Sequence, residues 1–484
     1  MKKWTLMVYI SADDVLDNFA VESLKQLKRA AGDDIEVFAQ FDPNVPGKSP
    51  SQYVFDASKK MDPSINSNRI RSRLGSDLDM ADPTRLTNFI KKATARCPAD
   101  YYGLVLWGHG PELLFDDDVP PNTPSSTRRY FTPETLRQAL QDKDLFKGKQ
   151  EKGRLDIIAI DACCMATVEV ASALQGCANY LIASQDDLPD ASFPYEQLLD
   201  KLRRLSQKGD VQRISKMVPK AYKEAFVDYI PTPANELRGI TLSAVDLDAI
   251  GTITNPLTEL SNSLLRASTD PTLSGKILEA RRQSHAFEFG LFVDLFDFCE
   301  QLDRTGHGDY RLTGACKSMQ AAIKKCVIEN ESTASGKSIP GCHGLSVYFP
   351  YGTNHPIEKA VLNIDGTKNG TNHPIKLRTE RIAELEKDYG KLQIDGQSDW
   401  IQFIKLGWSV ILAKEVPDEL DTHYSALQCT KNLLPGAAKG ITLSPQPKKL
   451  LLKTGRRKHG SGRTNGTQWP IHRGDEGPEE HPPN

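Results

Sequence analysis

The 484-residue chain predicts an α/β fold with a mainly parallel sheet that is covered by helices on both faces. Two observations lead to this fold class. Short, nearly continuous apolar runs such as 4–10, 101–107 and 155–161 are typical of strands that are buried on both faces. Amphipathic segments such as 17–32 lie between these runs and have the spacing of helices. Apolar strands that alternate with helices form parallel sheets.

The elements can be justified in chain order. Gly32 is a helix stop, Asp82 and Pro83 open the second helix, and Thr132 is the N-cap of the third. The sequence predicts strands over 4–10, 35–41, 101–107, 155–161 and 178–184, and helices over 17–32, 81–97, 132–141 and 165–175. Beyond these it predicts a strand entering a helix over 239–250, a helical segment over 256–267, and further elements over 292–302, 313–327 and 344–350.

These elements indicate three parts. Residues 1–268 form the first domain, and 269–435 form a smaller carboxyl-terminal α/β domain. Residues 436–484 are poor in apolar side chains and rich in Lys, Arg, Gly and Pro, so we expect a disordered tail.

The bulk composition excludes several classes of protein. A formal net charge of −2 gives no reason to expect nucleic-acid or anionic membrane binding. The nine scattered cysteines contain no C-x-x-C pair, so neither a disulfide framework nor a zinc site is expected. The apolar run 4–10 is followed at once by Asp13 and Asp14 instead of a cleavage site, and no run is long enough to span a membrane. We therefore expect a cytoplasmic protein; the oligomeric state stays open.

One reactive group stands at the end of a strand. His109 lies between two glycines directly after the apolar run 101–107. The next predicted strand, 155–161, is followed by Cys163. Because one crossover helix joins the two strands, a right-handed connection places their carboxyl ends side by side or nearly so. The two residues are 54 positions apart, and caspases place their histidine about 50 residues before the cysteine.

A thiol beside an imidazole is the arrangement of a cysteine hydrolase. The glycines around His109 allow close approach of the backbone to a substrate, and Gly110 offers an N–H group to an oxyanion. We expect the helix after Cys163 to direct its amino end toward the sulfur and favour the thiolate. Cys164 is expected to be inert packing.

At this point the chain resembles the clostripain family of cysteine peptidases, relatives of caspases. The similarity covers most of the first 435 residues and follows several motifs in order: "WTLMVYISADDVLDNFAVESL", "YYGLVLWGHG", "DACCM" with Glu169 after it, "ASQDDLP", "FPYEQLL", "TLSAVDL", "VDLFDF" and "GLSVYFP". The resemblance implies a caspase-like three-layer αβα sandwich. It also implies that His109 is the catalytic histidine and Cys163 the nucleophile.

The resemblance further implies cleavage of peptides and proteins after Arg or Lys. Asp161 matches one acid of the specificity pocket, and either Asp186 or Asp187 matches the second. Related peptidases mature by internal cleavage, which makes Arg128 and Arg129 the expected site of self-cleavage in the long polar segment after His109.

The chain also departs from the family pattern. Pro111 stands where the family often continues with glycines, which affects the oxyanion side. No loop has a recognisable calcium spacing, and the acidic run 116–118 is more simply explained as solvated, so no cofactor or metal is expected. An inactive caspase-like scaffold is the alternative function. A nucleotide-binding fold is disfavoured because the segment after the first strand, "SADDVLDN", is acidic and has no glycine.

Overall fold

The computed structural model describes residues 2–12, 16–43, 49–59, 64–70, 74, 78–110, 130–142, 145–146, 153–189, 191–206, 209–227, 239–287, 290–350, 397–409 and 411. Five features from the sequence analysis lie outside these residues: the pair Asp13 and Asp14, Pro111, the acidic run 116–118, the pair Arg128 and Arg129, and the carboxyl-terminal segment 436–484. No described helix is both long and apolar enough to cross a bilayer.

The centre of the fold is a nine-stranded sheet with the order β11-β8-β7-β6-β5-β1-β2-β3-β4. The five strands from β7 to β2 run parallel to their neighbours, and the strands at either end are antiparallel. The mainly parallel sheet is therefore confirmed. The strands are β1 (Lys2–Ala12), β2 (Ile35–Pro43), β3 (Ser51–Phe55), β4 (Arg69–Ile70), β5 (Ala99–Trp107), β6 (Leu155–Asp161), β7 (Ala178–Ala183), β8 (Ile240–Asp246) and β11 (Val327–Thr333).

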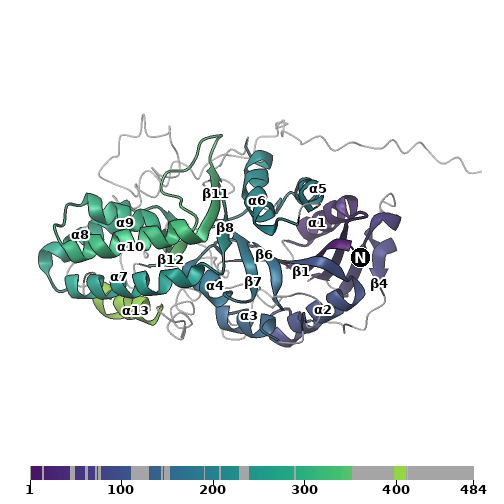
Figure 1. The fold of residues 1–484 in the computed structure, drawn as a ribbon, viewed down its shortest axis with the longest axis horizontal. Coiled ribbons are helices and arrows are strands. Elements are labelled where there is room, and N and C mark those ends of the chain that lie inside the picture. The colour runs from purple at the N-terminus through teal and green to yellow at the C-terminus, as the bar shows by residue number, and fades with distance from the viewer. Residues whose placement is uncertain are drawn as a thin grey trace, which may run out of the picture. The chain divides into compact units, whose positions relative to one another are not determined.

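Helices cover both faces of this sheet (Figure 1). One face packs against α1 (Asp17–Ala30), α5 (Tyr195–Ser206) and α6 (Val211–Ala225). The other packs against α2 (Pro83–Arg96), α3 (Pro133–Leu140) and α4 (Val168–Ala173). Successive side chains of a central strand point to opposite faces of the sheet, and each face has its own hydrophobic core. Both sets of alternate residues are therefore apolar, which gives the continuous apolar runs in the sequence.

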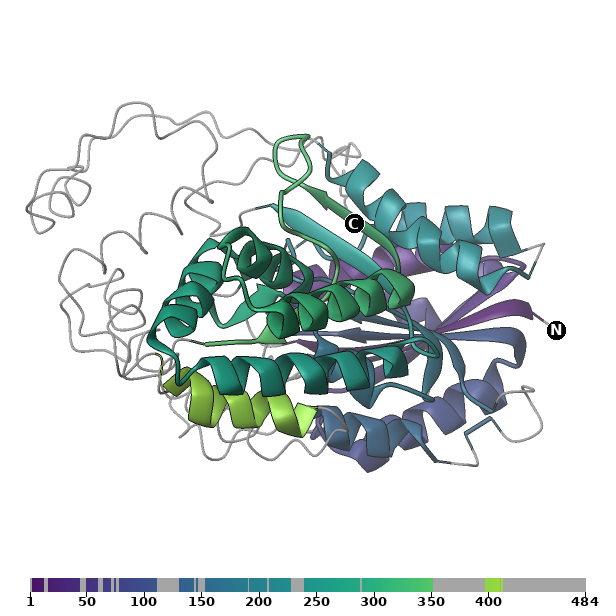
Figure 2. The ribbon, with the colours of Figure 1, turned by 60° about the vertical axis from the view of Figure 1, so that its left-hand side comes forward.

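A group of helices and a small sheet follow the carboxyl end of β8 (Figure 2). The small sheet has the order β12-β10-β9, and all its pairings are antiparallel. Its strands are β9 (Ala286–Phe287), β10 (Phe292–Asp294) and β12 (Ser346–Tyr348). The helices of this group are α7 (Thr254–Ala267), α8 (Pro271–Gln283), α9 (Leu295–Arg304), α10 (Tyr310–Cys326) and α13 (Gln397–Gln402). Short 3₁₀ turns elsewhere in the chain and in this group lie at Ala57–Lys59, Ile65–Asn68 and Ile250–Ile253, and a π-helical turn lies at Phe403–Trp408.

This second group shares one continuous hydrophobic core with α2, α3 and α4. Strand β11, which follows the predicted boundary at residue 268, pairs with β8 in the large sheet. The division into 1–268 and 269–435 stays a prediction.

The sequence patterns located the central elements and missed the peripheral ones. The caps at Asp82 and Thr132 are present, with the side chain of each accepting a backbone N–H of the first helical turn. Eight strands and helices were not predicted: β3, β4, β9, β11, α5, α6, α8 and α13. Strand β11 has the sequence VIENEST, which lacks the apolar run of a buried strand because it lies at the edge of the sheet.

Candidate active site

The parallel pairing of β5 and β6 brings the two predicted catalytic residues to the same edge of the sheet. Trp107 at the end of β5 is the register partner of Asp161 at the end of β6. The backbone N–H of Gly108 continues the pairing and donates to the carbonyl of Asp161 at 3.3 Å. His109 and Cys163 therefore each follow a paired strand end by two residues, as the crossover argument predicts.

Gly110 lies directly against the backbone of Cys163. A Cβ atom at this position would overlap the carbonyl oxygen of Cys163 and would lie 2.9 Å from its carbonyl carbon and its nitrogen. Because these are backbone atoms, no side-chain rotation can relieve the overlap. The glycine after His109 is thus needed for close approach between the two segments, a reason different from the approach to a substrate that its position in the sequence suggested.

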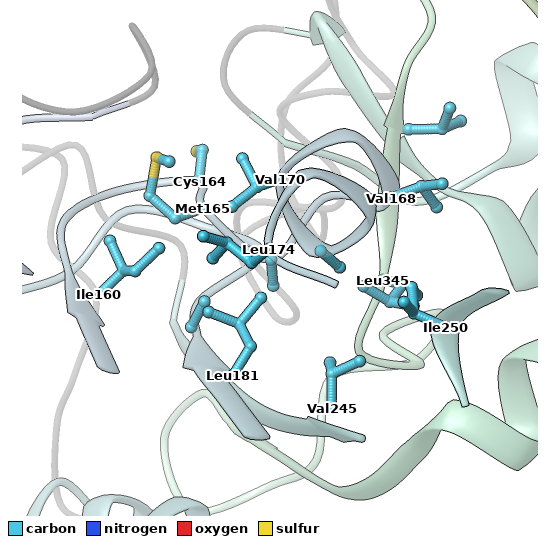
Figure 3. Packing of buried hydrophobic residues seen from close by; sticks show 14 of the residues in the cluster. Ile160, Cys164, Met165, Val168, Val170, Leu174, Leu181, Val245, Ile250 and Leu345 are labelled. Atoms are coloured by element: carbon cyan, nitrogen blue, oxygen red, sulfur yellow. The ribbon is translucent and has the colours of Figure 1, made fainter. Parts of the chain in front are cut away.

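The two adjacent cysteines have different surroundings. Among the eight described cysteines, Cys163 alone is partly exposed. Its Sγ accepts a hydrogen bond from the backbone N–H of Leu188 at 3.3 Å. Cys164 is buried, and Figure 3 shows it beside Met165 among apolar side chains such as Val170. These surroundings agree with the expectation that Cys164 is inert.

Cys164 also has an unusual backbone. Its φ angle is 56°, in the left-handed region that residues other than glycine rarely adopt. Such a conformation costs on the order of 1 kcal/mol and persists where neighbouring contacts hold it. Here the N–H of Cys164 donates to the carbonyl of Asp186 at 3.2 Å, and its Sγ lies 3.7 Å from Oδ1 of Asp187.

The helix expected directly after Cys163 begins later than predicted. Helix α4 starts at Val168 with Thr167 as its N-cap, so the residues from Cys164 to Thr167 lie outside the helix instead of forming its first turn. The amino end of α4 is therefore separated from Cys163 by four residues, and the helix does not begin next to the thiol as predicted. The donor that the structure places on the sulfur is the N–H of Leu188, which comes from the segment after β7.

Asp161 is the centre of a buried hydrogen-bond network. Its Oδ2 accepts from the hydroxyl groups of Ser192 and Tyr195 and from the N–H of Phe193 at 3.3 Å. Trp107 extends the network by donating its Nε1–H to Ser192 at 2.7 Å. Burial raises the pKa of Asp161 to about 6, and the three donors oppose this by favouring the charged carboxylate.

Ser192, Tyr195 and Leu188 were not recognised from the sequence as part of the site. Ser192 has a φ of 63°, a second left-handed residue near this edge of the sheet. The signal available in the sequence was the pair of motifs "ASQDDLP" and "FPYEQLL", which contain or flank all three residues. Their partners lie 25 to 34 residues away, so no local pattern reveals the contacts.

The two candidate acids after β7 differ in exposure. Asp186 is buried, and its carbonyl is the acceptor for Cys164. Asp187 is partly exposed. Together with Cys164 they form the one group of three potential metal ligands found among the described residues, with ligand atoms within 4.8 Å of one another. A thiol and two carboxylates do not match the six to eight oxygen ligands that calcium requires, so this group does not provide a calcium site.

Comparison with known proteins decides the family. The profile of the clostripain family matches residues 8–406, which is most of the chain. The chain belongs to the clostripain family. Clostripain of Hathewaya histolytica is 21% identical over 401 residues, which cover 72% of this chain and 75% of that protein. The chain is accordingly a cysteine protease.

Two solved structures of C11 proteases share the fold. An inactive zymogen from Parabacteroides distasonis aligns with a TM-score of 0.56 and 18% identity over 82% of this chain and 98% of that one. A secreted cysteine protease from Bacteroides thetaiotaomicron, in complex with an irreversible peptide inhibitor, aligns with a TM-score of 0.53 and 17% identity over 82% and 99% of the two chains. The α/β architecture predicted from the sequence is confirmed by this similarity.

This clostripain-family protease carries a second buried acid shortly after the segment 162–167, which contains Cys163. Glu169 lies in the first turn of α4, and its Oε1 accepts the N–H of Tyr348 in β12 at 3.0 Å. Its Oε2 is buried and has no hydrogen-bond partner. Burial raises the pKa of Glu169 to about 7. The carboxyl group therefore binds a proton more tightly in the folded than in the unfolded chain.

Replacing Glu169 with Gln should change how stability depends on pH. Because the pKa of Glu169 is about 7 when folded and 4.5 ordinarily, its favourable contribution is complete below pH 4.5 and is lost as pH rises through 7. Wild type should therefore lose about 3 kcal/mol of unfolding free energy relative to Glu169→Gln between pH 4.5 and 8. Urea unfolding of both proteins across this range measures the difference. Two curves that stay parallel would contradict the assignment.

Proposed function

We propose that this protease cleaves peptide bonds after Arg, and less readily after Lys, through a dyad of His109 and Cys163. The observation that carries the proposal is the β5–β6 register, which brings the segment 108–110 against the backbone of Cys163. The partial exposure of Cys163 and the N–H donor on its sulfur add support, because a catalytic thiol must be accessible and stabilised as the thiolate. Peptides and proteins are the substrates that this chemistry implies.

The reaction follows from these groups. His109 takes the proton of the Cys163 thiol, and the thiolate attacks the carbonyl carbon of the scissile bond. The N–H of Gly110 is our candidate donor to the resulting oxyanion. His109 then gives its proton to the leaving amine, the C–N bond breaks, and an acyl-enzyme remains. Water, deprotonated by His109, attacks the thioester, releases the new carboxylate and returns the thiol.

Specificity for a basic residue needs a fixed anion beside the sulfur. Asp161 is two residues from Cys163 and is held in one orientation by the donors on its Oδ2. Of the two acids after β7, Asp187 is partly exposed and Asp186 is as buried as Asp161 itself, so either is a candidate for its companion. A planar guanidinium pairs with a carboxylate through two hydrogen bonds, which favours Arg over Lys.

The first prediction of the proposed function distinguishes the roles of the adjacent cysteines. Cys163→Ala should abolish hydrolysis of an Arg peptide, since the attacking atom is lost. Cys164→Ala should retain most of the activity, because its sulfur is buried and does not attack the substrate in the proposed mechanism. Fluorogenic peptide turnover measures both. Activity that disappears only in Cys164→Ala would reverse the assignment, and no turnover or covalent labelling of wild type by any peptide probe would support the inactive-scaffold alternative.

The second prediction concerns the specificity pocket. Asp161→Asn should raise KM for Arg substrates by about tenfold or more, since it removes a charge-assisted hydrogen bond worth roughly 1.5–3 kcal/mol. A substrate with a neutral side chain at the same position should be affected far less, and it serves as the control for a general loss of structure. A peptide library in which wild type prefers acidic or small residues would contradict the pocket altogether.

The third prediction concerns self-processing. Arg128 and Arg129 lie outside the described residues, and they match the residue type that the proposed pocket accepts. Wild-type protein should divide into two fragments, one ending at Arg128 or Arg129 and one holding the remainder of the 484 residues. Cys163→Ala should stay intact, and a variant with Gln at both arginines should do the same. Mass spectrometry of purified protein locates the cut, and a wild type that turns over substrate as one uncut chain would contradict the prediction.

A further inference from the structure

Gln185 makes a complete set of hydrogen bonds in the interior of the protein. The residue is 1% exposed and is the second residue after the end of β7. Its Nε2 donates to Oδ2 of Asp294 at 2.9 Å and to Oγ of Ser346 at 3.0 Å, and its Oε1 accepts from the N–H of Gly344 at 2.8 Å. Both amide hydrogens and the carbonyl oxygen are thus used. Such a fully paired buried amide holds its surroundings in one arrangement.

The backbone around Gln185 is fixed by a second element. The hydroxyl oxygen of Thr241 in β8 accepts the N–H of Gln185 at 3.0 Å and that of Asp186 at 3.1 Å, and it also bonds to the hydroxyl of Ser184 at 2.8 Å. The segment 184–188 therefore depends on hydrogen bonds to β8, β10 and β12, since it lies beyond the end of its own strand.

The segment 184–188 contacts the nucleophile turn (residues 162–167) at three points. Ser184 accepts the N–H of Ala166 at 2.7 Å, Asp186 accepts that of Cys164 at 3.2 Å, and the N–H of Leu188 donates to the Cys163 sulfur at 3.3 Å. The last contact is only three residues beyond Gln185. A displacement of Gln185 would consequently change the distance between the Leu188 N–H and the sulfur.

Strand β12 holds the nucleophile turn by a separate route. The N–H of Ser346 donates to the carbonyl of Ala166 at 2.9 Å, and Thr167 forms a parallel bridge with Ser346. The side chain of the same Ser346 accepts from Gln185. One residue of β12 therefore links the turn that carries the sulfur to the segment that carries its donor, and Gln185 is the connecting group.

We infer that Gln185 is a positioning residue, which holds the segment 184–188 so that the N–H of Leu188 stabilises the Cys163 thiolate. The inference rests on the proposed role of Cys163 as the nucleophile. Gln185 does not touch substrate and acts through Leu188. A hydrogen bond to the charged form of a group favours that form, so loss of this donor shifts the thiol toward its protonated, unreactive state.

The test uses the reactivity of Cys163 in the full chain. Iodoacetamide alkylation of Cys163 is followed by mass spectrometry from pH 5 to 9 for wild type and Gln185→Leu. The midpoint of the rate profile should rise by about one pH unit in the variant, as expected for a charge-assisted hydrogen bond. kcat/KM for an Arg peptide at pH 7 should fall about tenfold, with most of the change in kcat.

Gln40→Leu is the matched control. Gln40 is also a buried glutamine, lies in β2, and is bonded to Gln52 and the sulfur of Met80. The same substitution there removes a buried amide without touching the segment 184–188. Its alkylation midpoint should equal that of wild type. Ser346→Ala is the milder companion variant, because it removes one acceptor of Gln185, and it should raise the midpoint by a smaller amount.

Gln185→Glu gives a readout that a general loss of stability would not produce. Once it is ionised, its carboxylate faces the Asp294 oxygen that Gln185 normally contacts at 2.9 Å, and the two repel. As pH falls within the assay range, the new acid takes up a proton and donates to Asp294 in place of the amide. The alkylation rate of Gln185→Glu relative to wild type should therefore increase as pH falls, although both absolute rates decrease.

Two results would overturn the inference in distinguishable ways. Wild-type midpoints in both Gln185→Leu and Ser346→Ala, with Cys163→Ala inactive, would refute the positioning role while leaving the proposed nucleophile intact. Full activity of Cys163→Ala would refute the proposed nucleophile itself, and this inference with it.

Discussion

The candidate site depends on one constraint, the side-by-side parallel pairing of β5 and β6. Parallel strands end at the same edge of a sheet, so a register that pairs Trp107 with Asp161 also brings the residues that follow them together. A slip of one residue would turn every side chain of a strand to the opposite face. Because the faces belong to two different cores, such a slip would bury the wrong side chains on both sides. The apolar residues of these strands therefore fix the site as firmly as its own hydrogen bonds do.

Beyond the strand ends, the site is held by paired polar groups instead of regular structure. Asp161 and Gln185 are both buried, and each fixes a segment that lies outside the strands and so lacks regular backbone hydrogen bonds to a neighbouring strand. A buried polar group without partners is costly, so each of these residues selects the one arrangement that satisfies it. This accounts for the left-handed backbone of Cys164 and Ser192, whose strain is offset by the hydrogen bonds around them.

The sequence predicted the apolar strands of the parallel sheet and the site residues that directly follow two of those strands. Apolar runs located β1, β2, β5, β6 and β7, and the single crossover between β5 and β6 placed His109 and Cys163 at one edge. It could not predict β11, whose polar sequence reflects an edge position. Nor could it find Gln185, whose partners lie 109 to 161 residues away and leave no local pattern. The start of α4 was predicted too early because residues 164–167 are held in a non-helical conformation by their contacts with β12 and the segment after β7.

The charges around Cys163 create a conflict that the substrate itself can resolve. Asp161, Asp186 and Asp187 lie close to the nucleophile turn in sequence or in space, and negative charge nearby disfavours a thiolate. The N–H of Leu188 acts in the opposite direction, as His109 would in the proposed mechanism once it has taken the thiol proton. In the proposed pocket, the cationic side chain of a substrate neutralises the acids at the moment when the thiolate is needed. Binding of a basic residue and activation of the sulfur are then coupled, so a neutral residue loses both the ion pair and part of the nucleophile's reactivity. Selectivity for basic residues would in that case be expressed in kcat as well as in KM.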